Sequence, residues 1–165
     1  MLAQSADAAF WLLIFALPLT AWVVFSDLRS MLIPNAAVLG LLGVYALVGV
    51  LTLPLSVWAW SWLHFAVILT LGFLLSLTGG FGAGDAKFAA AMAPFVALGD
   101  ARLFVLLLAA VSLAGFVTHR LARRVELVRA QTPDWESWHR AEFPMGLVLG
   151  PALIFYLALA SIYGS

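Results

Sequence analysis

Residues 8–26 read AAFWLLIFALPLTAWVVFS, and no charged side chain interrupts them. A helix that crosses the hydrocarbon core of a bilayer needs about 20 mostly apolar residues. This stretch has a suitable length and composition, and Asp27 and Arg29 follow directly after it. We therefore predict a first transmembrane helix here. It should be retained rather than cleaved as a secretory signal, because its first basic residue, Arg29, comes after the apolar run and not before it.

Five further stretches repeat this pattern between charged or helix-breaking residues. They predict spans over 35–54, 57–77, 86–99, 101–119 and 143–163. Across the chain 65% of residues are hydrophobic and 10% are charged, whereas an average soluble domain is about 45–50% apolar and about 25% charged. The sequence thus predicts an all-α polytopic membrane protein of about six transmembrane helices, forming a single domain over residues 1–165.

The basic residues indicate how these spans are oriented. If all six cross, Arg29, Lys87 and the five arginines that follow the fifth span lie on one face, and only Arg102 lies on the other. If the short fourth run turned back instead, the division would be three against five. Cytoplasmic loops carry an excess of Lys and Arg. Six crossings are therefore favoured, with both termini outside the cytoplasm.

Two aspartates lie where apolar spans end. Asp27 follows the first span, and Asp85 follows the third, in the segment GAGDAK (82–87). Ionisable groups at the membrane boundary are candidates for function. Two carboxyl groups at one water cannot easily both ionise, so one can deprotonate the water while the other protonates a carbonyl oxygen. This chemistry needs no metal, cofactor or nucleophilic side chain, which suits a chain without cysteine and with three scattered histidines.

The glycines before Asp85 have two interpretations. Because Gly79, Gly80, Gly82 and Gly84 lack side chains, they would let a peptide backbone approach Asp85 closely. Alternatively, they only end the third span and turn the chain, with Asp85 capping the next helix. Spacing alone leaves both interpretations open.

The only long polar stretch follows the fifth span. Leu121, Val125 and Val128 recur there at helical spacing beside several arginines, which predicts an amphipathic helix lying on the membrane surface. Trp135 and Trp138 are candidates for the same interface. A solvated basic loop that fixes the topology, or a docking site for a substrate, are the alternatives.

Taken together and in order, the motifs around the two aspartates resemble the paired signatures of type IV prepilin peptidases, which are aspartyl proteases of the Gly-x-Gly-Asp type. The elements that carry the resemblance are Asp27-Leu28-Arg29, Ile33-Pro34-Asn35, the 82–87 segment and Phe143-Pro144-Met145-Gly146. They extend over almost the whole chain.

The resemblance implies that Asp27 and Asp85 are the catalytic pair of a membrane-embedded endopeptidase. Such an enzyme removes the short basic leader of a pilin or pseudopilin precursor at the cytoplasmic face of the inner membrane. The implied partners are that precursor peptide and membrane lipids. The net charge of zero and the lack of a basic tail give no reason to expect nucleic-acid binding.

Larger members of the family carry an extra cytoplasmic segment with paired cysteines and also methylate the new N-terminus. This chain has no cysteine and only a few residues between its first two spans. It therefore resembles the compact TadV/CpaA-like peptidases of Tad/Flp pilus systems, and methyl transfer is not favoured.

Supporting or substrate-binding roles are assigned to residues of the same motifs, each with a structural alternative. They are Arg29, Pro34, Asn35, Gly82, Gly84, Lys87, Pro144 and Gly146. Pro34 suits the first turn of the second span. Lys87 could hold substrate carboxylates or a lipid phosphate, or act on Asp85. Neighbours two apart do not share a helix face, so a direct Lys87–Asp85 pair requires a non-helical backbone.

Two other functions remain as alternatives to proteolysis. A small proton-coupled transporter would use Asp27 and Asp85 as a relay. A non-catalytic membrane assembly protein would carry the aspartates only as incidental helix caps. The second alternative predicts that either aspartate can be replaced without loss of function.

Overall fold

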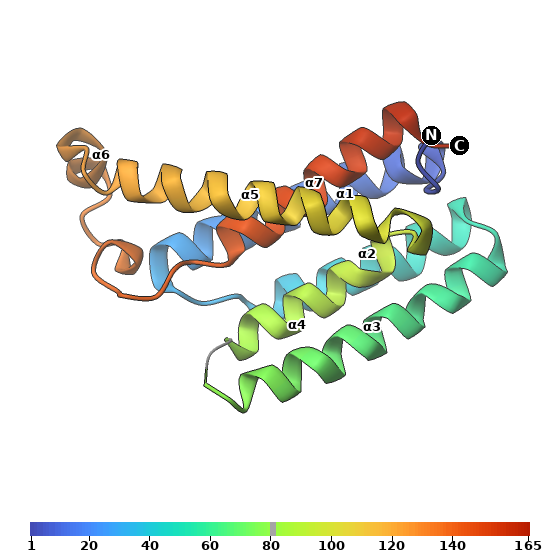
Figure 1. Ribbon diagram of the computed structural model, residues 1–165, viewed down its shortest axis with the longest axis horizontal. Helices are drawn as coiled ribbons and strands as arrows, with labels where there is room; N and C mark the ends of the chain where they lie inside the picture. Colours follow the sequence, from blue (N-terminus) through green and yellow to red (C-terminus); the bar gives the residue numbers. More distant parts are fainter. Residues whose placement is uncertain (80–81) are drawn as a thin grey trace.

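The computed structural model describes residues 1–79 and 82–165, which fold into helices joined by loops (Figure 1). The α-helices are α1 (Ala6–Ser30), α2 (Asn35–Thr52), α3 (Leu55–Ser76), α4 (Ala83–Met92), α5 (Ala101–Ala122), α6 (Glu126–Gln131) and α7 (Gly146–Tyr163). Short 3-10 helices lie at η1 (Ala93–Phe95), η2 (Leu98–Asp100) and η3 (Glu136–Trp138). The predicted all-α class is confirmed over the described residues.

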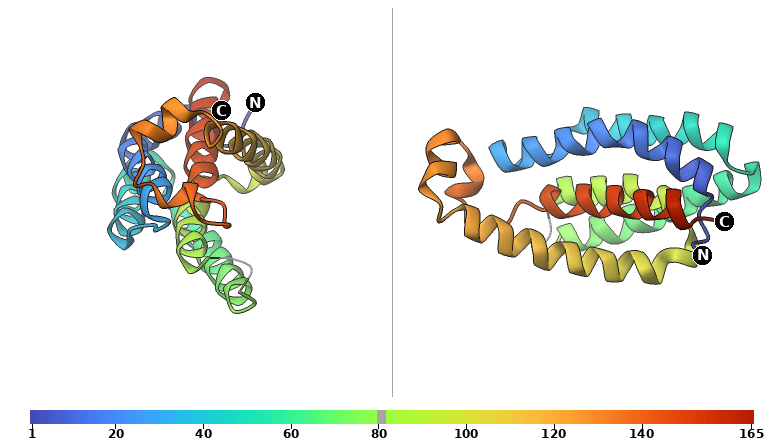
Figure 2. Two further views of the ribbon diagram at one scale, coloured as in Figure 1. Left: turned by 90° about the vertical axis from the view of Figure 1, so that its left-hand side faces the viewer. Right: turned by 90° about the horizontal axis from the view of Figure 1, so that it is seen from above.

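Five helices are long and apolar enough to cross a membrane, and these are α1, α2, α3, α5 and α7. Their axes follow the long axis of the molecule (Figures 1 and 2). Most of the large apolar side chains of α3 and α5 are exposed, which suits helices whose outer surface is covered by lipid tails. The prediction of a polytopic membrane protein is therefore confirmed, although the helix boundaries differ from the predicted ones by a few residues.

The fourth predicted span, 86–99, does not form a helix of spanning length. Helix α4 contains ten residues, which rise about 15 Å, roughly half of the hydrocarbon thickness. Pro94 lies in the 3-10 turn η1 that follows. Proline has no N–H to continue the hydrogen-bond ladder of an α-helix. The helix therefore gives way to η1 and η2.

The chain nevertheless crosses the bundle in this segment. At the start of α4, Gly84 lies against Ile33 in the turn between α1 and α2, and we call this the Asp27 end of the bundle. After η2, the chain has reached the opposite end, where Asp100 binds the backbone of Ala3 and Gln4 and where both termini lie (Figure 1). The fourth predicted span thus crosses the bundle as a short helix followed by two 3-10 turns.

The core lies where α1, α2, α4 and α7 meet. Its large, fully buried side chains include Leu12, Leu41, Phe88 and Leu153, one from each of these helices. Helices α1 and α7 form the central pair. A Cβ atom added to Gly150 of α7 would lie only 3.4 Å from the carbonyl oxygen of Thr20 in α1. Small residues at such contacts let membrane helices pack closely.

A buried carboxylate at the end of the bundle that holds the termini belongs to Asp100, a residue that the sequence did not single out. Asp100 accepts hydrogen bonds from the N–H groups of Ala3, at 2.8 Å, and Gln4, at 3.0 Å. The hydroxyl of Tyr156 in α7 donates a third, at 2.9 Å. The same hydroxyl oxygen accepts from the N–H of Ala97 at 3.1 Å. This network joins the N-terminal segment, η2 and α7.

The polar stretch after α5 differs from the prediction. Leu121 belongs to α5, which ends at Ala122, and α6 contains only six residues. The predicted continuous surface helix is therefore wrong, because a turn at Arg123 and Arg124 interrupts it. Trp138 is packed inside the protein and does not expose its ring as an interface anchor would. Its side chain is 4% exposed, and its indole donates hydrogen bonds to the carbonyl and hydroxyl oxygens of Thr132.

We expect Asp100→Ala to destabilise the fold, because three donors lose their acceptor. A hydrogen bond to a charged group contributes roughly 1.5–3 kcal/mol, so the expected loss is roughly 2–5 kcal/mol. Thermal unfolding of the purified protein in detergent measures this effect. Asp7→Ala is the matched control, since Asp7 is exposed in the first turn of α1 at the same end. Equal losses in the two variants would contradict a special role for Asp100.

Candidate active site

Asp27 lies in the last turn of α1, because the helix continues to Ser30 instead of ending at residue 26 as predicted. Its side chain is 4% exposed. Its Oδ2 atom accepts a hydrogen bond of 2.6 Å from the backbone N–H of Gly146, the first residue of α7. The first N–H groups of a helix have no partner within the helix and favour a nearby negative charge. The start of α7 thus supplies a donor to Asp27.

The contact depends on the absence of a side chain at Gly146. A Cβ atom added there would lie 2.9 Å from Cβ of Asp27 and 3.0 Å from Oδ2. Pro144, two residues earlier, is fully buried and precedes the first turn of the helix. Pro144 and Gly146, two of the residues assigned a supporting role from the sequence, thus lie at the entry to α7.

Asp85 is the third residue of α4 and is half-buried. The N–H of Gly82, the residue that caps α4, donates a hydrogen bond to its carboxylate. This is the arrangement in which an acidic side chain in the first turn satisfies the N-terminal backbone of its own helix. A Cβ atom on Gly82 would lie 2.5 Å from Oδ2 of Asp85. Asp85 therefore caps its helix. Its two carboxylate oxygens can still accept further hydrogen bonds from other groups.

The fold brings the two aspartates to the same end of the bundle. Gly84, next to Asp85, packs against Ile33, which lies in the turn just after α1. Within the described residues no hydrogen bond joins the two carboxylates directly. Two carboxyl groups from different helices thus lie at the same end of the bundle.

Lys87 and Asn35 are also brought together. The Nζ atom of Lys87 lies 3.5 Å from Oδ1 of Asn35 and donates toward it. Lys87 and Asp85 both lie in helical backbone, so the direct pair that would require a non-helical backbone is not formed. Pro34 stands immediately before α2 instead of in its first turn, and Asn35 begins the helix.

Two other predicted positions are less closely connected to the aspartates. The side chain of Arg29 is exposed, and it forms no ion pair with Asp27 among the described residues. Gly79 has a φ of +74°, a backbone conformation that glycine adopts without strain. Gly80 lies outside the described residues. Neither finding identifies a function for these positions.

The loop before α7 covers the end of α1, which the sequence did not predict. The ring of Trp135 meets that of Phe25 edge to face at a centroid distance of 5.9 Å. Trp135 in turn stacks on Trp138, and Trp138 stacks on His119 of α5. This aromatic stack connects α1 to α5 next to the turn that carries Asp27. The only feature of the sequence that could have indicated this stack is the presence of two tryptophans, Trp135 and Trp138, in an otherwise polar loop.

No group of three or more His, Cys, Asp or Glu side chains that could hold a metal ion occurs within residues 1–79 and 82–165. The nearby donors and acceptors at the Asp27 end are carboxylates, one lysine, one asparagine amide and backbone N–H groups. Such a set can bind water and a peptide group, and it can transfer protons.

We expect Gly146→Ala to destabilise the protein, because the new methyl group must displace Asp27. Overpacking of this kind costs typically about 1–3 kcal/mol. Gly43→Ala in α2 is the matched control, since a Cβ atom there meets nothing within 4 Å, and alanine is favoured over glycine in a helix by about 1 kcal/mol. The measurement is the unfolding temperature of each of the two variants in detergent. Equal stability of the two variants would show that the α1–α7 contact is not tight.

Comparison with known proteins identifies the family. The model of the type IV leader peptidase family matches residues 11–118. The match covers 108 of the 165 residues (118 − 11 + 1) and includes both Asp27 and Asp85. No curated protein and no solved structure matches the chain. Because the family model covers well over half of its length, the chain belongs to the type IV leader peptidase family.

Proposed function

We propose that this protein is an aspartyl endopeptidase that removes the short basic leader of a pilin-like precursor. Membership of a leader peptidase family makes it a peptidase, and its apolar helices make it a membrane protein. The observation that carries the proposal is the placement of Asp27 and Asp85. They come from different helices, α1 and α4, to one end of the bundle.

The proposed reaction uses the two carboxyl groups in different protonation states. One carboxylate removes a proton from a water molecule, and the oxygen of that water forms a bond to the carbonyl carbon of the scissile peptide. The protonated partner donates its proton to the carbonyl oxygen. When the tetrahedral intermediate collapses, the C–N bond breaks and the leaving amine takes up a proton. A new carboxyl end and a new amino end result.

The contacts of Asp27 suit a positioned reactant. The N–H of Gly146 binds Oδ2, so the side chain is oriented and Oδ1 is available for water or substrate. Preorganised geometry of this kind lowers the entropic part of a reaction barrier. The pair of Lys87 and Asn35 lies in the same α2–α4 region, and we propose that it contacts the substrate backbone or a substrate carboxylate.

We propose that this site faces the cytoplasm at the inner membrane. The C-terminal ends of α1, α3 and α5 and the start of α4 all lie at the Asp27 end. Seven of the eight basic residues lie in these helix ends or in the loop that follows α5. Arg102 is the exception, in the first turn of α5 near Asp100. The positive-inside tendency then orients this end toward the cytoplasm. A precursor whose apolar helix stays in the membrane would present its basic leader on that side.

Asp27→Asn and Asp85→Asn are each expected to lower the cleavage of a co-expressed pilin precursor by at least about a hundredfold, because each removes a proton-transfer group. Immunoblotting of precursor and mature pilin measures cleavage, and the abundance of each variant in membranes is checked in parallel. Asp134→Asn is the matched control, since this aspartate is exposed in the loop before α7. Normal cleavage by either site variant would remove that aspartate from catalysis and favour a transporter or an assembly protein.

The pH dependence of kcat/KM is expected to be bell-shaped. At low pH both carboxyl groups are protonated, so no base is present and the rate falls. At high pH both are ionised, so no acid is present and the rate falls again. Cleavage of a leader peptide by the purified enzyme across the acidic and neutral range tests this expectation. A constant rate over the whole range would argue against a shared proton.

A further inference from the structure

The stretch from Arg120 to Gln131 forms a basic arm at the end of α5. It contains four arginines and one glutamate, so its formal charge is +3. Figure 1 and the right-hand view of Figure 2 show that α6 extends beyond the end of α1. The basic arm therefore lies past the apolar part of the helices, at the depth of lipid headgroups if the long helices span the bilayer.

The arginines of the basic arm form no ion pair with a carboxylate among the residues that the structure describes. Among the described residues, the only ion pair joins Arg140 to Glu136, outside the arm. The guanidinium of Arg120 lies 5.2 Å from the ring centroid of Phe116. The remaining arginines of the arm are free to bind an anion supplied from outside the chain.

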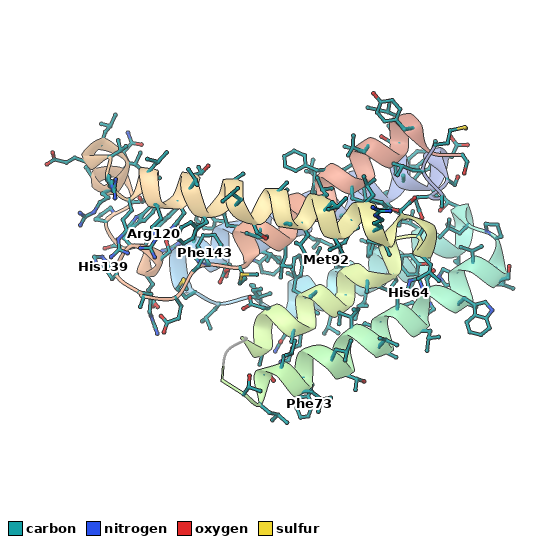
Figure 3. All side chains as sticks on the ribbon, viewed as in Figure 1. His64, Phe73, Met92, Arg120, His139 and Phe143 are labelled. Carbon is teal, nitrogen blue, oxygen red and sulfur yellow. The ribbon has the colours of Figure 1, made fainter. Side chains whose placement is uncertain are left out.

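Two of these arginines line a common hollow. The hollow has a volume of about 520 Å³, and its lining includes Arg124, Arg129, Trp138 and His139, together with one carboxylate, that of Glu126. Figure 3 labels His139 and Arg120 at this end of the molecule. A guanidinium can donate two parallel hydrogen bonds to a phosphate, and an imidazole can add another. The donor set therefore suits a phosphate group.

Apolar side chains beside the arginines identify the source of that phosphate. Leu121, Val125 and Leu127 are 56%, 46% and 70% exposed. Arginines that alternate with exposed aliphatic residues are typical of segments that lie in the bilayer interface. A soluble phosphate would not cover these side chains, whereas the acyl chains of a phospholipid would.

We propose that the basic arm binds the phosphate of an anionic phospholipid through Arg124, Arg129 and His139. The lipid belongs to the leaflet at the Asp27 end, and its acyl chains cover the exposed aliphatic side chains of the arm. This site is separate from Asp27 and Asp85 and does not depend on the proposed proteolysis. It attaches the connection between α5 and α7 to the membrane surface.

Native mass spectrometry of the purified full-length protein in detergent tests this site, with phosphatidylglycerol and phosphatidylcholine of the same chain length as probes. Each basic residue near an anionic surface strengthens binding about five-fold. We therefore expect Arg124→Gln/Arg129→Gln to weaken phosphatidylglycerol binding about thirty-fold. Arg102→Gln/Arg140→Gln is the matched control, because it removes the same charge outside the hollow.

Wild-type protein is expected to bind phosphatidylglycerol more tightly than phosphatidylcholine, and a large excess of inorganic phosphate is expected not to displace the lipid. Equal binding of the two lipids, full displacement by inorganic phosphate, or equal losses in the double variant and its control would each overturn the proposal. If the double variant does not give a monodisperse helical protein, the single variants Arg124→Gln and Arg129→Gln replace it, each with an expected loss of about five-fold.

Discussion

The hydrogen bond from the Gly146 N–H to Asp27 joins the last turn of α1 to the first turn of α7. It exists because two conditions coincide: the first N–H groups of a helix lack a partner within it, and glycine leaves no side chain between the two backbones. Further along the same pair, Gly150 allows an equally close approach to Val24. The contact that builds the centre of the bundle therefore also determines the position of the buried carboxylate.

The second carboxylate depends on a different constraint. Asp85 lies at the start of a ten-residue helix that packs between α2, α3 and α7. On the α3 side, Gly72 faces Ala86, and a Cβ atom on the glycine would lie 2.9 Å from that of the alanine. Small residues thus hold α4 against α3, while Pro94 prevents it from continuing as a regular helix. The break is compatible with the membrane because Pro94 and Phe95 of η1, and half of the residues of α4, are buried within the protein.

The two ends of the bundle differ in chemistry. At the end that holds the termini, the carboxylate of Asp100 accepts three hydrogen bonds, two from backbone N–H groups and one from the hydroxyl of Tyr156. At the other end, Asp27 and Asp85 each accept a backbone N–H, but no cationic side chain pairs with them among the described residues. A buried carboxylate with a complete set of partners stabilises structure, whereas incompletely paired carboxylates are available for chemistry.

The helical class, the five long spans and the location of Asp27 at the end of α1 could be predicted from the sequence alone, because in a bilayer these depend on the length of local apolar runs. The ordered motifs of the sequence also indicated the peptidase family. Only the tertiary structure decided that Gly146 binds Asp27, that Lys87 meets Asn35, and that Trp138 is buried. These contacts join residues up to 119 positions apart, and they depend on how helix surfaces pack, which no local pattern of hydrophobicity encodes.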